Sequence, residues 1–207
     1  MGSEMCIRDS STIEQEYNRC LASIPRMRAL IRESRRWLEP NVSISLDEWN
    51  VWYAWYRPSS VTDGIYAALA MHLLMEEAEK SGVALACHFQ AVNEGMLCVE
   101  PEGVSLTAQG QMFSLMNRHA GNRVCSASQE AVVTVDRENA VTATLVNASF
   151  CREKPVDFSQ YGPCREAILY TSSTVLPPSA FEKRDILEQA RNGSLCMPPH
   201  SVLLLRF

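Results

Sequence analysis

Two adjacent carboxylates, Asp47 and Glu48, stand at the end of a short stretch in which apolar residues alternate at Val42, Ile44 and Leu46. Three of the four tryptophans of the chain follow within the next seven residues. A carboxylate at a strand end can act as a nucleophile or an acid, and aromatic rings beside it can stack on sugar rings. The alternative interpretation is a strand end with a helix-capping acid and tryptophans that fill the core.

The elements predicted around this stretch would place it in an α/β fold. The spacing of apolar residues predicts helices over residues 11–38, 61–82 and 107–119 and strands over 42–46 and 83–90. This alternation indicates βαβ units with a parallel sheet. The nearly continuous apolar run of the second strand is typical of a strand buried on both faces. The pattern alone leaves a βα-barrel and an open sheet as alternatives.

Helix ends are marked by residues with special backbone preferences. Pro25 is expected to start a second helix or to kink a single one. Gly82 is placed to cap the C-terminus of the next helix, and Gly121 ends the last one.

The β-rich part of the chain begins after residue 121. Four runs rich in β-forming residues are separated by Asn, Pro, Gly and Ser clusters, as is typical of an antiparallel sandwich. These runs are residues 131–136, 140–149, 167–173 and 201–207. We therefore predict one domain over residues 11–121 and a β-sandwich domain over residues 122–207.

The first ten residues, "MGSEMCIRDS", are treated separately. They resemble a translated transposon end from DNA library preparation, so residues 1–10 are interpreted as a sequencing scar and left out of the fold. Two strands cannot form a stable parallel sheet by themselves, because their edges and faces would stay uncovered. We therefore expect residues 11–121 to be the end of a larger domain, and the chain to be a fragment.

Composition and charge exclude several classes of function. The formal net charge is −5, so no basic field favours nucleic acid, and no apolar stretch is long enough to cross a bilayer. The eight cysteines form no CxxC pair and the four histidines are dispersed. We therefore expect no metal site, no cofactor, no nucleic-acid or membrane partner, and free thiols in a reducing cytoplasm.

The segment "ISLDEWNVWY", residues 44–53, closely resembles the motif around the nucleophile of family 51 glycoside hydrolases, the α-L-arabinofuranosidases. The later segments "FQAVN" and "RHAG" and the β-rich end occur in the same order as in that family, so the resemblance covers residues 11–207. It implies the last two βα units of a (β/α)8 TIM barrel followed by an antiparallel β-sandwich. It also implies a retaining enzyme that removes terminal arabinofuranosyl groups from oligosaccharides such as those of arabinan and arabinoxylan.

The resemblance implies a role for five residues. Glu48 matches the nucleophile, which forms a covalent glycosyl-enzyme intermediate. Trp52 matches a position on the aglycone side of the pocket, and Gln90 matches a residue that hydrogen-bonds the arabinose. Asp47 and Asn50 are expected to orient Glu48 and the pocket backbone. The parent enzyme is expected to be a cytoplasmic homo-oligomer.

Three further points concern the geometry of the site. Strict alternation would put Glu48 on the same face as Leu46, so the strand must bulge or twist if that face packs on helices. The second carboxylate of a retaining glycosidase belongs to an earlier strand in this family, and Glu94 lies in the wrong place for it. The fragment alone is therefore expected to be inactive. His88 could line the pocket or pack in the core.

Two other functions are compatible with the sequence. The β-rich part could be a non-catalytic carbohydrate-binding or interaction module, although its aromatic residues are spread out and include no tryptophan. Alternatively, the parent could be a related barrel glycosidase with a different sugar preference.

Overall fold

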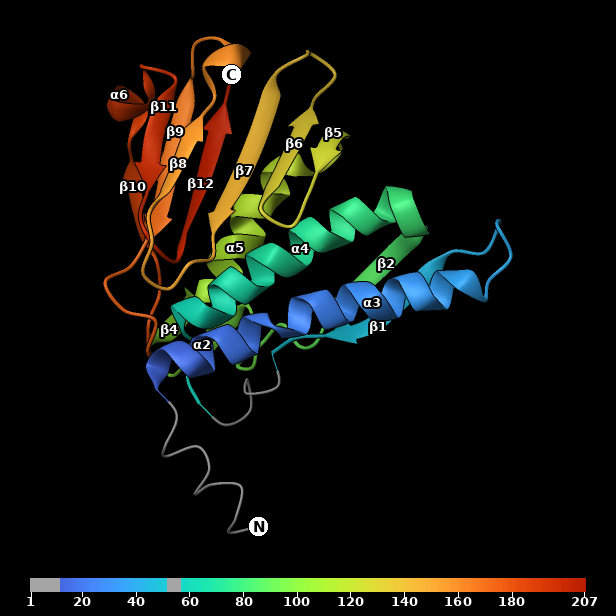
Figure 1. Cartoon of the computed structure of the whole chain (residues 1–207). Helices are drawn as coiled ribbons and strands as arrows, with labels where there is room; N and C mark the ends of the chain where they lie inside the picture. Colours follow the sequence, from blue (N-terminus) through green and yellow to red (C-terminus); the bar gives the residue numbers. More distant parts are fainter. Residues whose placement is uncertain (1–11, 52–56) are drawn as a thin grey trace.

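The computed structural model describes residues 12–51 and 57–207. Helices and two short parallel strands come first, and a six-stranded antiparallel sheet follows (Figure 1). The helices of the described residues are α2 (Ile13–Leu21), α3 (Ser23–Arg36), α4 (Val61–Ser81), α5 (Ala108–Met116) and α6 (Leu187–Ala190), with the 3-10 turns η1 (Asn117–His119) and η2 (Ser159–Tyr161).

The ends of the first helices follow from local chemistry. The Thr12 side chain accepts a hydrogen bond from the backbone of Gln15, whose own side chain bonds back to residue 12, so α2 begins with a capping box. The helical segment breaks at Ala22, and Pro25 occupies the third position of α3, where a missing N–H leaves no helix bond unmade. Gly82 ends α4 at a φ of 72°.

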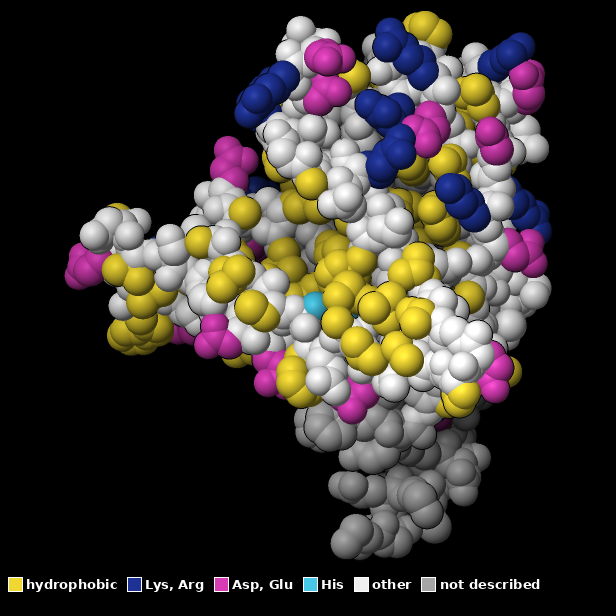
Figure 2. Space-filling view, turned by 180° about the vertical axis from the view of Figure 1, so that it is seen from behind, with side chains coloured by type: hydrophobic (Ala, Val, Ile, Leu, Met, Phe, Trp, Pro, Cys, Tyr) yellow, Lys and Arg dark blue, Asp and Glu magenta, His cyan; other side chains and the backbone are white. Residues whose placement is uncertain are grey.

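Strands β1 (Ile44–Trp49) and β2 (Val83–His88) form the parallel pair. Helix α3 covers one face of the pair, where Ile31 lies in one apolar cluster with the first residue of each strand. The opposite face is open: Leu85 is 56% exposed and Cys87 is also exposed. Figure 2, seen from behind relative to Figure 1, shows hydrophobic side chains gathered in the middle of the molecule on that side. The prediction that β2 is buried on both faces is therefore wrong for the described residues, because helices cover only one side of this small sheet.

The larger sheet has the strand order β10-β9-β12-β7-β6-β5, and two small antiparallel sheets pair β8 with β11 and β3 with β4. The bounds are β3 (Leu97–Glu100), β4 (Gly103–Leu106), β5 (Arg123–Ala127), β6 (Ala131–Val135), β7 (Val141–Asn147), β8 (Lys154–Asp157), β9 (Glu166–Thr171), β10 (Glu182–Asp185), β11 (Ser194–Met197) and β12 (Ser201–Arg206).

The large sheet is a middle layer with cover on both faces. On β12, Val202 and Leu204 belong to the core shared with α4 and α5, whereas Leu203 and Leu205 belong to the core beneath β8, β11 and α6. Successive side chains of a strand point to opposite faces. This two-sided burial explains why β12 is a continuous apolar run in the sequence.

The sequence predicted the mixed α/β architecture and the four main β runs, which form β6, β7, β9 and β12. Two features differ from the prediction. The layer facing β12 is a two-stranded sheet with α6, and the residues between the strand predicted over 83–90 and the helix predicted over 107–119 form the β3–β4 hairpin, where no strand was predicted. The described residues form no closed barrel. None of their helices is long and apolar enough to cross a membrane.

Candidate functional site

Strand β1 carries one extra residue just before its end. Leu46 is paired with Ala86 and Trp49 with His88, so two residues of β1 lie between these pairs where β2 has only one. This two-against-one pairing is a β-bulge, which breaks the regular alternation of side chains at that point.

The bulge decides where Glu48 lies. Leu46 packs toward the helices and Trp49 is buried among them, whereas the two residues between them, Asp47 and Glu48, are both exposed. Without the extra residue, Glu48 would share the helix-covered face with Leu46. The strand therefore bulges, one of the two possibilities left open by the sequence, and both carboxylates lie away from the helices.

Gln90 lies two residues beyond the end of β2. The backbone N–H of Phe89 donates to the carbonyl of Trp49, the last residue of β1, at 3.1 Å, which continues the parallel pairing one residue past the end of β2. Gln90 follows, after a cis peptide bond, and is exposed. Because carboxyl ends of parallel strands meet at one edge of a sheet, Glu48 and Gln90 stand at the same edge.

Asn50 fastens the segment after β2 to the end of β1. Its Nδ2 donates to the carbonyl of Phe89 at 2.6 Å and to the carbonyl of Glu94 at 2.9 Å. Its Oδ1 accepts from the backbone of Val51 at 2.7 Å and from Nε2 of Gln109 at 3.0 Å. Asn50 thus holds the backbone on both sides of Gln90 in a fixed position relative to Glu48.

No role was predicted for Gln109, which lies in α5 and is 2% exposed. Its Oε1 lies 2.8 Å from Nε2 of His88, and its Nε2 bonds Asn50. Burial lowers the pKa of His88, although the bond to Gln109 opposes this shift. Because an amide oxygen can only accept, Nε2 of His88 donates to Gln109. The only sequence signal was a long polar side chain between two small residues in an apolar helix.

Two other residues singled out by the sequence have a definite place. His88 packs edge-on against Trp49, with ring centroids 4.9 Å apart, so it lies in the core rather than on the open face. Asp47 accepts a hydrogen bond from the Ser45 hydroxyl at 2.6 Å, on the open face of β1. Trp52, the predicted aglycone neighbour, lies outside the described residues.

Gly95 is required by the close packing behind Gln90. A Cβ at position 95 would lie 2.1 Å from the carbonyl oxygen of Gln90 and 2.4 Å from Cε1 of His88. The Gly95→Ala variant should therefore displace Gln90 and lose about 1–3 kcal/mol of stability, the usual cost of overpacking. Denaturant unfolding measures this loss. The Ser105→Ala variant on exposed β4 is the control and should stay within about 0.5 kcal/mol of wild type; equal effects of both would contradict the steric explanation.

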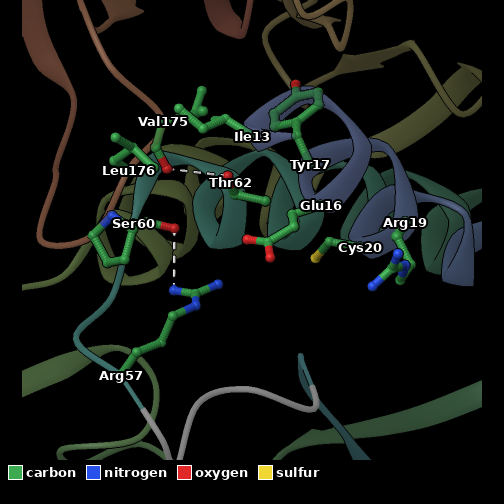
Figure 3. A pocket seen from close by; sticks show the side chains of 11 residues that line it. Ile13, Glu16, Tyr17, Arg19, Cys20, Arg57, Ser60, Thr62, Val175 and Leu176 are labelled. Atoms are coloured by element: carbon green, nitrogen blue, oxygen red, sulfur yellow. Dashed lines mark hydrogen bonds between the residues drawn. The ribbon is translucent and has the colours of Figure 1, made fainter. Parts of the chain in front are cut away.

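A cavity of about 230 Å³ lies away from this edge, between α2, the start of α4 and residues 175–177 (Figure 3). Its lining includes Cys20, whose pKa burial raises to about 12, with nearby Asp63 adding to the rise and Arg57 opposing it. The thiol therefore stays protonated near neutral pH and is a poor nucleophile. Among residues 12–51 and 57–207, no group of three or more His, Cys, Asp or Glu side chains is arranged to hold a metal ion.

Comparisons with known proteins identify the fold. No protein-family model matches the sequence, and no curated protein matches it either. Solved structures do match the fold, and glycoside hydrolases are prominent among them. One is the catalytic domain of a family 30 xylanase from Talaromyces cellulolyticus, at 11% identity and a TM-score of 0.53, covering 80% of this chain and 41% of that chain.

The structure matches those of family 51 α-L-arabinofuranosidases more fully. The enzyme from Xanthomonas axonopodis pv. citri aligns with a TM-score of 0.75 at 18% identity, over 95% of this chain and 48% of its own. The enzyme from Bifidobacterium longum aligns with a TM-score of 0.72 at 17% identity, over 97% of this chain and 50% of its own. The chain therefore spans about half the length of these structures, and at this identity the likeness establishes the fold.

Proposed function

We propose that this chain is the C-terminal part of a retaining α-L-arabinofuranosidase that removes terminal arabinofuranosyl groups from oligosaccharides. The observation that carries the proposal is the bulge in β1, which turns Glu48 onto the open face at the carboxyl edge of the parallel strands. Reacting groups of (β/α)8 enzymes lie at this edge. The fold that the chain shares with family 51 enzymes supports the same assignment.

In this proposal Glu48 is the nucleophile. Its carboxylate attacks the anomeric carbon as the glycosidic bond breaks, and the arabinosyl group is left on the Glu48 oxygen as an ester. Water then attacks the same carbon, which releases arabinose with retained configuration. Gln90 hydrogen-bonds the sugar, and Asn50 acts as a positioning residue because it fixes the backbone around Gln90.

The leaving group needs a second carboxylate that protonates the glycosidic oxygen and later activates the water. Glu94 is unsuited to this role. It lies at the end of the segment after β2 that Asn50 fastens, on the wall of a separate cavity. The partner carboxylate is therefore assigned to a part of the parent protein outside this chain. We expect the 207-residue chain by itself to be inactive.

Assays of the parent protein with nitrophenyl glycosides test the proposal. The α-L-arabinofuranoside should be the best substrate, and proton NMR should show that the first product has retained configuration. A β-D-xyloside is the informative competitor, since the family 30 xylanase shares the fold. Preference for the xyloside would favour a related glycosidase of different specificity, and inverted product would exclude the covalent mechanism.

A further inference from the structure

A second cavity, larger than the one beside α2, has a volume of about 570 Å³. It lies between the residues that lead into α4, the segment that joins β2 to β3, and residues 178–180 beside the large sheet. Neither Glu48 nor Gln90 lines it. Its size falls in the range of about 300–1,000 Å³ that is typical of small-molecule sites.

Two buried polar atoms on the wall of this cavity have no hydrogen-bond partner within the described residues. They are the hydroxyl oxygen of Ser59 and the Oε2 carboxylate oxygen of Glu94. Leaving a buried polar group unsatisfied costs about 1–3 kcal/mol, and more for a charged group. Two such atoms on one cavity therefore point to a ligand that bonds both.

Four other polar side chains of the wall are already engaged. Arg57 forms a bidentate pair with Asp63, with both nitrogen-to-oxygen distances at 2.7 Å. Ser179 accepts from the backbone of Val61 at 3.0 Å, and Gln109 is taken up by its bonds to His88 and Asn50. The buried atoms of Ser59 and Glu94 are consequently the ones left for a ligand to bond.

The charge of the wall restricts the ligand further. Asp63 neutralises Arg57, so the carboxylates of Glu94 and Glu100 remain as a net negative charge on the lining. This charge disfavours phosphates and acidic sugars. A ligand hydroxyl can donate to the Glu94 oxygen, and a second hydroxyl can exchange a bond with Ser59.

We propose that this cavity binds a neutral polyhydroxylated ligand of the size of a mono- or disaccharide. Glu94 accepts from one ligand hydroxyl, Ser59 bonds another, and the apolar lining at Pro58, Pro178 and Ala180 contacts the carbon skeleton. The site is separate from the Glu48 face and does not depend on the function proposed for it.

Cysteine protection tests the proposal on the complete chain, because different free thiols report on different places. Cys98 lines the cavity and is partly buried, Cys87 lies on the open face of β2, and Cys125 is exposed on β5. Iodoacetamide labelling of each thiol is followed by peptide mass spectrometry, with and without L-arabinose or D-xylose. We expect the sugar to slow labelling of Cys98 and to leave Cys125 unchanged.

Variants link any protection to the two unpaired atoms. The Glu94→Gln variant keeps the shape and removes the charge, and it should weaken protection of Cys98 about tenfold or more. The Ser59→Ala variant should also weaken the protection of Cys98. The Glu102→Gln variant, at the exposed turn of the β3–β4 hairpin that carries Cys98, should behave as wild type. Thermal unfolding confirms that each variant is folded.

Three outcomes would overturn the proposal. One is labelling of Cys98 that no sugar slows. Another is protection by propylamine but not by sugars, which would assign the cavity to a cation. The third is protection of Cys98 that persists in both Glu94→Gln and Ser59→Ala. Protection of Cys87 alone would also count against the cavity, and it would support sugar binding on the Glu48 face.

Discussion

Replacing Glu48 by Gln in the complete parent enzyme should lower kcat by about 10⁴-fold or more, because an amide cannot form the covalent glycosyl intermediate. The exposed position that the bulge gives to Glu48 is what makes it available for attack. The loss should appear in kcat and much less in KM, since the amide keeps the size of the side chain.

The neighbouring carboxylate is the matched control. Asp47 is also exposed and accepts a hydrogen bond from Ser45, so Asp47→Asn should keep kcat within about tenfold of wild type. A small nucleophile offers a second readout. In Glu48→Gly, azide should occupy the vacated space and give an arabinosyl azide of inverted configuration. Near-normal kcat in Glu48→Gln would exclude Glu48 as the nucleophile.

Lowering the pH from 7 to 5 should destabilise the fold by roughly 2–4 kcal/mol through two buried histidines. His72 and His119 both lie within hydrogen-bond distance of the Thr144 hydroxyl, at 2.8 and 2.9 Å, where α4 and η1 pack on β7 of the large sheet. Burial lowers the pKa of His72 to about 3 and that of His119 to about 4. For His72, nearby Lys154 and His119 lower it further, and the Gln129 carbonyl opposes the shift.

The direction follows from proton uptake. Below pH 6.5 the unfolded chain protonates these histidines while the folded chain does not, so stability falls as the pH falls. The loss continues toward pH 4 for His119 and pH 3 for His72 and then levels off. Most of the change between pH 7 and 5 lies above the range in which ordinary carboxyl groups titrate.

Denaturant unfolding at a series of pH values measures this effect. A variant with His72→Gln and His119→Gln should be less stable at pH 7 but should show a much shallower slope between pH 6.5 and 5. The His200→Gln variant keeps both buried histidines and should retain the wild-type slope. A wild-type stability that stays constant over this range would refute the assignment.

The sequence alone predicted much of the fold, because many determinants are local. Helix α2 begins beside Thr12, Pro25 lies in the first turn of a second helix, and Gly82 ends α4, as the preferences of these residues predict. The four main β runs were also predicted correctly. The shared position of Glu48 and Gln90 could be anticipated, since both follow consecutive strands of a βαβ unit.

Other features depend on partners that are distant in the sequence. The β3–β4 hairpin was missed because each of its strands has only four residues, and its apolar face, which includes Val104 at 65% exposure, is not buried against another element. Gln109 acquires its importance only when α5 brings it beside Asn50 and His88. The pair of His72 and His119 exists only because α4 and η1 meet over one threonine of the large sheet.

The sequence by itself determined that a carboxylate pair and an amide would follow two parallel strands, because the spacing of apolar residues along the chain indicates where strands and helices form. Only the tertiary structure decided which way Glu48 points. The side-chain period of a strand predicts the helix-covered face, and the pairing of β1 with β2 inserts the extra residue that reverses it. Register is a property of two strands packed together, so no single stretch of sequence contains it.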